Sequence, residues 1–114
     1  MSLSRLGDYL DQMLTAANDA RRFVDGMSKE DFLADKRTQQ AVVMSLVIIG
    51  EAAARIMDKH SQFVADNSEI PWRGIRGMRN RVTHGYFDID LNVVWATTQT
   101  ALPDLLSQLE RLRR

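Results

Sequence analysis

Residues 41–57 read AVVMSLVIIGEAAARIM, and this apolar stretch decides the fold. Its β-branched cluster alone would permit a strand, but its length and its alanines favour a helix over residues 36–58. The apolar side chains cover more than one side of that helix, so we expect several neighbouring segments to bury it. These apolar positions are Val42, Val43, Leu46, Val47, Ile48, Ile49, Ala52, Ala53, Ile56 and Met57.

Amphipathic segments on either side can supply those neighbours. Apolar residues spaced by three and four predict a first helix from residue 3 to about 24, which Gly26 ends. A helix over about residues 73–83 follows the break at Pro71. Asp90 is placed to cap a last helix, which Pro103 should bend because it removes one backbone hydrogen bond. Ser28 followed by Asp31 predicts a short capped turn over residues 29–33, and residues 60–67 add another turn.

The sequence shows no strand pattern and no internal repeat. We therefore predict an all-α fold, an up-and-down bundle of four main helices with short helical turns, as one domain spanning residues 1–114.

The composition indicates a soluble globular protein. Of 114 residues, 45% are hydrophobic and 26% charged, and none is cysteine, which excludes disulfides and thiolate sites. The apolar run that ends at Gly50 is too short to cross a bilayer, and the N-terminus lacks the layout of a signal peptide. We therefore expect a cytoplasmic location and no membrane partner.

Charge is unevenly spread along the chain, although the formal net charge is zero. Residues 70–87 contain four arginines and no acidic residue. A planar guanidinium offers a fork of donors that suits phosphate. The sequence thus lacks a global basic field for duplex nucleic acid, but it predicts a local anion site. The four arginines are Arg73, Arg76, Arg79 and Arg81.

One motif lies within that basic segment: Arg79-Asn80-Arg81-Val82-Thr83-His84-Gly85-Tyr86. Histidine is the side chain best suited to proton transfer near neutral pH. Metal-independent cleavage of RNA needs a group that moves protons and a group that bears the charge building on phosphorus. Asp88 and Asp90 form no metal set with one neighbouring histidine, so we expect neither a metal nor a cofactor.

A regular helix, at about 100 degrees per residue, brings five polar residues of this segment onto one arc and the apolar Ile75, Met78 and Val82 onto the other side. Arg79 and His84 remain about 140 degrees apart on that helix, so one copy alone cannot focus both on one phosphate. A second copy related by two-fold symmetry would supply the missing partner. The polar residues, which we expect to face outward, are Arg73, Arg76, Arg79, Asn80 and His84.

The same helix can be interpreted without any catalytic role. It would then show a solvated basic face, with His84 as a favourable cation at the helix C-terminus. Solvated faces normally mix charges of both signs, which weakens this interpretation. The residues alone leave both interpretations open.

The pattern Arg79-x4-His84-x-Tyr86 resembles the signature of the HepT-like toxins within the HEPN superfamily. Further similarity lies in Ile49-Gly50-Glu51-Ala52, in the break at Ile70-Pro71-Trp72 and in Gly77-Met78-Arg79-Asn80, and it extends over essentially the whole chain.

The resemblance implies a metal-independent endoribonuclease toxin, paired with a minimal nucleotidyltransferase (MNT) antitoxin and active on RNA. It also implies a homodimer with two motifs around one cleft, further assembly being left open. By position, Arg79 and His84 are the implied catalytic pair, with Asn80 as their polar companion. Tyr86 matches the tyrosine that the antitoxin modifies with AMP.

The hypothesis that follows is attack of the ribose 2′-hydroxyl on the adjacent phosphate, with Arg73 and Arg76 helping to bind the phosphates. Glu51 has two possible roles: an ion pair with Arg55 one turn on, or a brace for Arg79. The alternative function is a non-catalytic, nucleotide- or substrate-binding partner of a nucleotidyltransferase. A scaffold for that partner is a third, weaker possibility.

Overall fold

The computed structural model describes residues 2–113, with the side chains of all of these except residues 2–4, 86 and 113. The chain forms helices throughout this part and no strand, which confirms the predicted all-α class. The elements are α1 (Ser2–Phe23), α2 (Lys29–Leu33), α3 (Lys36–Lys59), α4 (Ser61–Asp66), α5 (Trp72–His84), η1 (Tyr86–Asp88), α6 (Leu91–Ala96), η2 (Thr97–Ala101) and α7 (Leu102–Arg113).

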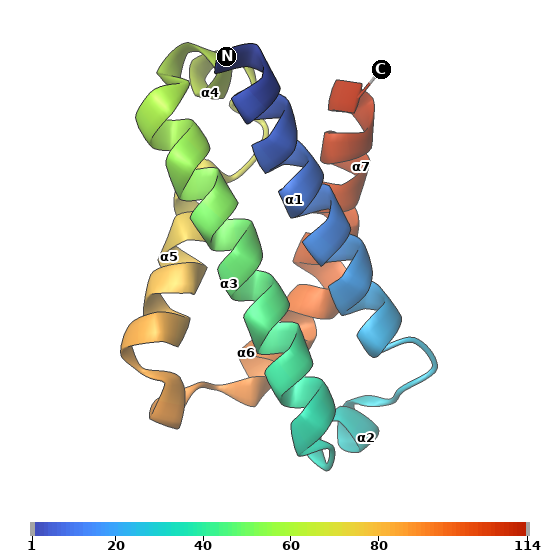
Figure 1. The fold of residues 1–114 in the computed structure, drawn as a ribbon. Helices are drawn as coiled ribbons and strands as arrows, with labels where there is room; N and C mark the ends of the chain where they lie inside the picture. The colour runs from blue at the N-terminus through green and yellow to red at the C-terminus, as the bar shows by residue number, and fades with distance from the viewer. Residues whose placement is uncertain (1, 114) are drawn as a thin grey trace.

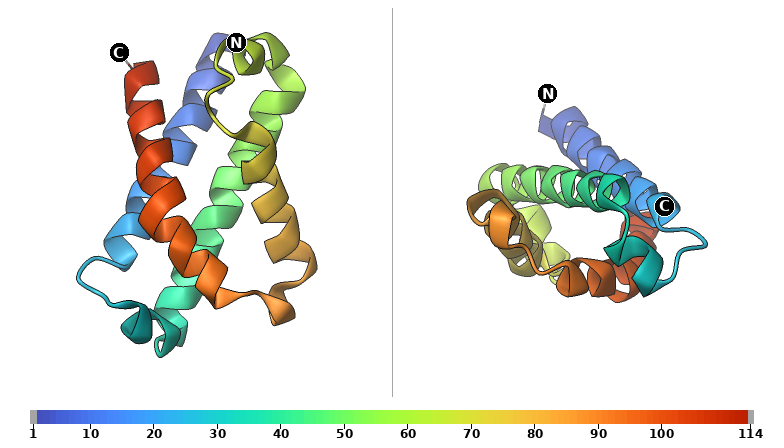
Figure 2. Two further views of the ribbon diagram at one scale, coloured as in Figure 1. Left: turned by 180° about the vertical axis from the view of Figure 1, so that it is seen from behind. Right: turned by 90° about the horizontal axis from the view of Figure 1, so that it is seen from below.

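The four main helices α1, α3, α5 and α7 run alternately down and up the molecule (Figure 1). The long helix α3 packs against α1 on one side and α5 on the other, while α7 packs against α1 from behind (Figure 2). As predicted, α3 is buried by several neighbours. Its buried side chains are Val42, Ser45, Leu46, Ile49, Ala52, Ala53 and Ile56.

Short polar caps set the ends of these helices. Gly26 follows α1 with a φ of 76°, a conformation that favours glycine. The Ser28 hydroxyl accepts from the backbone N–H of Asp31 (3.1 Å), and the Asp31 carboxylate accepts from that of Ser28 (3.0 Å), which forms the predicted capping box of α2. Asp35 caps α3, and Asp90 caps α6 as predicted.

The last helical segment is interrupted before Pro103, where η2 forms one wide π-helical turn. The backbone N–H of Leu102 bonds back to the carbonyl of Thr97, five residues earlier. In the same pattern the next residue would donate to the carbonyl of Thr98, but proline has no N–H. Arg21 of α1 donates to that carbonyl instead, at 2.8 Å. The disturbance expected at Pro103 is thus a π turn just before the proline, joined to α1.

By length and composition alone, α3 is the one helix of the described chain that is long and apolar enough to cross a membrane. In this fold the buried side chains of α3 lie inside the bundle, where the helix packs against α1 and α5, whereas Met44 and Ile48 are exposed. Residues 41–50, which are too short to cross a bilayer by themselves, are thus part of a longer apolar helix.

Candidate functional site

Helix α5 is fixed to the bundle at its two ends. Trp72 is buried at its first residue, and its indole Nε1 donates to the carbonyl of Asn67 at 3.1 Å. Val82 is buried in the last turn, and the half-buried Ile75 and Met78 face the core between them. The apolar edge predicted for this helix is confirmed, so the remaining polar side chains lie away from the core.

Arg79 is the exception to the predicted arrangement, because its side chain lies against α3 instead of facing outward. Only 18% of the side chain is exposed. Its stem crosses α3 directly over Gly50: a Cβ at position 50 would lie 2.2 Å from the Cβ of Arg79 and 3.4 Å from its Cα. Any side chain at position 50 would therefore push the two helices apart. Gly50 is needed here for the close approach of α5.

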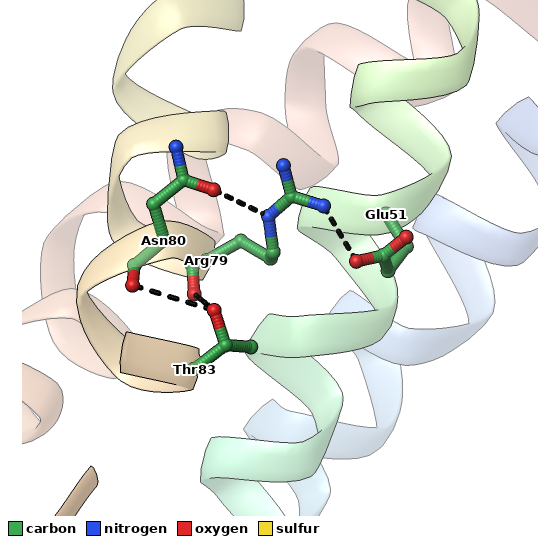
Figure 3. Close-up of polar contacts among 4 residues, drawn as sticks. All are labelled: Glu51, Arg79, Asn80 and Thr83. Atoms are coloured by element: carbon green, nitrogen blue, oxygen red, sulfur yellow. Dashed lines mark hydrogen bonds and ion pairs between the residues drawn. The ribbon is translucent and has the colours of Figure 1, made fainter. Parts of the chain in front are cut away.

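Two oxygen acceptors hold the guanidinium of Arg79 (Figure 3). Nη1 donates to Oε1 of Glu51 at 2.5 Å, and Nε donates to Oδ1 of Asn80 at 2.7 Å. Of the two roles that the sequence left open for Glu51, the ion pair with Arg55 is wrong: within the described residues, Glu51 pairs with Arg79 alone. Asn80 contacts the arginine and not the histidine.

Thr83 also contributes to this cluster, and sequence reasoning did not include it. Its hydroxyl donates to the carbonyl of Arg79 at 3.0 Å and approaches that of Asn80 at 3.3 Å (Figure 3). This bond to a carbonyl one turn earlier is common for threonine in helices. No sequence signal therefore distinguishes Thr83 from any other helical threonine.

His84 is the last residue of α5, and it is exposed. Among the side chains that the structure describes, its imidazole has no hydrogen-bond or ion-pair partner. The helix ends directly after it, where the backbone N–H of Gly85 donates to the carbonyl of Arg81. The imidazole is therefore open to a ligand but is not joined to Arg79 within one copy, which agrees with the separation predicted from helix geometry.

The other predicted residues are arranged as follows. Arg73 is exposed and Arg76 is half-buried, and neither has an acidic partner within the described residues. Tyr86 begins η1, two residues beyond His84, but its side chain lies outside the described residues. In the described part of the chain, no three acidic or histidine side chains are gathered where they could hold a metal ion.

The fold and the site together indicate to which class of protein the chain belongs. The basic helix carries an arginine fixed by a neighbouring carboxylate, and an exposed histidine five residues later. An arginine and a histidine are groups that can bind a phosphate and move a proton, so the arrangement is compatible with a small helical nuclease. The family model described as "Ribonuclease HepT-like" matches residues 13–112. The chain belongs to this HepT-like ribonuclease family, and it is thereby a ribonuclease.

Similar proteins carry names of the same kind. "Probable ribonuclease HepT" of Thermococcus cleftensis is 38% identical over 107 residues, which cover 94% of each chain. "Putative RNase TTE0752" of Caldanaerobacter subterraneus subsp. tengcongensis is 34% identical over 104 residues, 91% of this chain and 90% of the relative. "Putative RNase MJ0127" of Methanocaldococcus jannaschii is 30% identical over 104 residues, 91% of this chain and 84% of the relative. No solved structure matches the chain.

Proposed function

We propose that this protein is the toxin of a HEPN/MNT toxin–antitoxin pair, a metal-independent endoribonuclease of the cytoplasm that is silenced by AMPylation of Tyr86. One observation carries the catalytic part of the proposal. Arg79 is held between two helices in a fixed orientation, whereas His84 on the same helix is exposed and has no partner among the described side chains. A fixed cation and an open proton carrier are the two components that the reaction needs.

The proposed reaction is an internal transesterification of RNA. The ribose 2′-oxygen loses its proton to one imidazole and bonds to the adjacent phosphorus. The bond from phosphorus to the 5′-oxygen breaks, and that oxygen takes a proton from an imidazolium. The products are a 2′,3′-cyclic phosphate and a 5′-hydroxyl. Arg79 stabilises the charged phosphorane, and Arg73 and Arg76 bind flanking phosphates. DNA is inert because it lacks the attacking hydroxyl.

The proposed homodimer is supported by an apolar surface beside Arg79. Met44 is 58% exposed on the outer side of α3, and Phe87 of η1, just after α5, is 89% exposed. Both residues line a groove between α3 and the end of α5 whose lining also includes Val47, Val82 and Ile89, with the polar Lys36, Gln39 and Gln40 among its other members. Clustered apolar exposure of this kind marks an interaction surface. A second copy covering it would bring both Arg79–His84 pairs to one cleft.

The control step is a transfer of AMP to the hydroxyl of Tyr86 by the antitoxin. The backbone of η1 begins at Tyr86, so the attached nucleotide starts close to His84. Each AMP joined through a phosphodiester adds about one negative charge and a bulky base beside the arginines. Such a group would occupy the phosphate site and exclude RNA. Mass spectrometry of the protein produced together with its antitoxin tests this step, and Tyr86→Phe should escape both the added mass and the inhibition.

Incubation of purified protein with RNA and excess EDTA tests the catalytic proposal. His84→Ala should lower the cleavage rate by about 10²- to 10⁴-fold, since it removes the general acid–base group. His60→Ala is the matched control, because His60 is the only other histidine and its side chain makes no capping hydrogen bond. If His84→Ala cleaves as fast as His60→Ala, the assignment is wrong. Nucleotide binding without cleavage by the wild type would favour the alternative, a binding partner of a nucleotidyltransferase.

A further inference from the structure

Glu51 is the acidic residue nearest to the catalytic face, and it comes from a helix that the motif does not include. We infer that Glu51 is a positioning residue, which orients the guanidinium of Arg79 for the phosphate while Gly50 provides the space for the arginine stem. This inference rests on the proposed function and adds two residues of α3 to the site. It does not make Glu51 a catalytic residue, because Glu51 acts on RNA only through Arg79.

The geometry of the guanidinium supports this role. Arginine has five N–H donors in a rigid plane. Nε is used by Asn80 and one hydrogen of Nη1 by Glu51, so two acceptors on different elements restrict rotation of the plane. Within the described residues, Nη2 makes no hydrogen bond. In Figure 3 this nitrogen points away from Glu51, so its two hydrogens are available, with the second hydrogen of Nη1, to donate to phosphate oxygens.

Gly50 determines the position of the aliphatic stem of Arg79, which carries the guanidinium. The atoms nearest to a Cβ at position 50 are the Cβ, Cγ and Cα of Arg79, at 2.2, 2.7 and 3.4 Å. The arginine stem thus lies on bare backbone of α3, and Glu51 is the next residue along that helix. A glycine that admits the stem and a glutamate that binds its end form one local unit. The stem and the end of the arginine are both fixed by α3.

The negative charge of Glu51 makes the inference testable, because a positioning role and simple repulsion of RNA predict different effects when Glu51 is removed. Glu51 is 49% exposed, so an ordinary surface ion pair here would matter little to the fold. A carboxylate this close to bound RNA repels the phosphates. If Glu51 had no positioning role, its removal would leave the rate of the bound complex unchanged and would tighten RNA binding. If it orients Arg79, removal lowers the rate of the bound complex even though binding does not weaken.

The experiment measures kcat and KM separately on a short RNA, in EDTA, for Glu51→Ala, Glu51→Gln and Asp58→Ala. Glu51→Ala should lower kcat by about 10- to 100-fold, the effect of a small misplacement of a reacting group, with KM unchanged or lower. Glu51→Gln should recover part of kcat, because its amide oxygen still accepts a hydrogen bond. Asp58→Ala should match the wild type: it removes one negative charge from an exposed position of the same helix without contacting Arg79.

Equal kcat values for Glu51→Ala and Asp58→Ala would overturn the inference, as would a rise in KM with constant kcat. Neither result affects the assignment of His84, which fails only if His84→Ala keeps its activity. A second measurement does not need cleavage. In the NMR spectrum of the wild type at low temperature, the Nη1–H of Arg79 that bonds Glu51 should exchange slowly with water, and Glu51→Ala should speed that exchange. An unchanged exchange rate would overturn the inference even if the protein cleaved no RNA.

Discussion

Helix α3 makes two contacts that differ in chemistry. Helix α3 packs along α1, and the buried residues of the two helices include Ala52, Ala53 and Ile56 of α3 and Met13 and Ala17 of α1; all five are at most 2% exposed. Towards α5, helix α3 presents Gly50 and Glu51, which meet a charged arginine. An apolar part of the same contact has Ile49 of α3 and Met78 of α5 around one cavity. The first contact is dry and apolar, whereas the second contains an ion pair within reach of water. The contact of α3 with α1 thus contributes mainly to stability, whereas its contact with α5 contains the candidate site.

The two contacts also differ in how their partners are fixed. α1 buries five of its own side chains that are at most 5% exposed, including Met13, Leu14 and Ala20, while α5 buries only Trp72 and Val82. In the middle of α5 only one edge, with the half-buried Ile75 and Met78, packs against the core, and the rest of this turn carries Arg76, Arg79 and Asn80. Polar side chains at this position need not be removed from water completely, so the fold accommodates them without a large desolvation cost. The weaker helix contact provides the place for the site.

The largest expected effect on stability comes from the apolar contact. Met13→Ala removes a side chain that is 0% exposed and leaves a cavity between α1 and its neighbours. It should lower the free energy of unfolding by about 2–5 kcal/mol. Urea unfolding at 25 °C measures this loss, which should appear as a lower midpoint with an unchanged slope. RNA cleavage at a temperature where the variant remains folded should equal that of the wild type. A large fall in cleavage would show that the two contacts are not independent.

Gly50→Ala should affect both properties, because it changes the contact that contains the site. The added methyl group would lie 2.2 Å from the Cβ of Arg79, so α5 must shift. Overpacking of this kind typically costs about 1–3 kcal/mol. The shift also moves Arg79 relative to Glu51, so cleavage should fall by up to about 100-fold, the effect of a 1 Å displacement.

Gly77→Ala is the control for that substitution, since a Cβ at position 77 of α5 would meet no atom within 4 Å. Replacing a glycine in the middle of a helix with alanine should stabilise the protein by about 0.5–1 kcal/mol. Cleavage should not change. If both glycine variants behave alike in unfolding and in cleavage, helix propensity and not the close approach of α5 explains Gly50.

The two contacts also differ in how much of them could be predicted from the sequence. The apolar periodicity predicted the four main helices and their alternation, because burial depends on spacing that is visible along one helix. It also predicted the inner edge of α5 at Ile75, Met78 and Val82. The direction of Arg79 was predicted wrongly, since a regular helix drawn alone does not include the neighbour that Gly50 allows to approach.

The sequence also did not reveal the contacts between residues that lie far apart along the chain. Pro103 indicated a disturbed helix, but the donor that replaces the missing N–H is Arg21, which lies 77 residues from Thr98 along the chain. The ion pair of Glu51 was hidden for the same reason. Arg55, one turn away, was the candidate from local spacing, whereas the actual partner, Arg79, is 28 residues away. Local spacing indicates which partners are possible, and only packing selects among them.

The smallest expected effect concerns the start of α3, the helix that both contacts share. The hydroxyl of Thr38 donates to the carboxylate of Asp35 at 2.9 Å, and the backbone N–H of Thr38 donates at 3.2 Å. These hydrogen bonds, the hydroxyl bond first, lower the pKa of Asp35. A lowered pKa means that the cap stabilises the fold above the ordinary pKa of aspartate, about 4, and that this contribution disappears as the pH falls through the lowered value.

Asp35→Ala should therefore lower the melting temperature by a few degrees at pH 7, and the difference from the wild type should shrink below about pH 4. Asp35→Asn is the matched control, since asparagine also caps helices but does not titrate in this range. It should stay close to the wild type at pH 7. Because α3 supports both contacts, cleavage measured well below the melting temperature should be the same in all three proteins. A selective loss of cleavage in Asp35→Ala would mean that the first turn of α3, far from Gly50, also determines the position of Arg79.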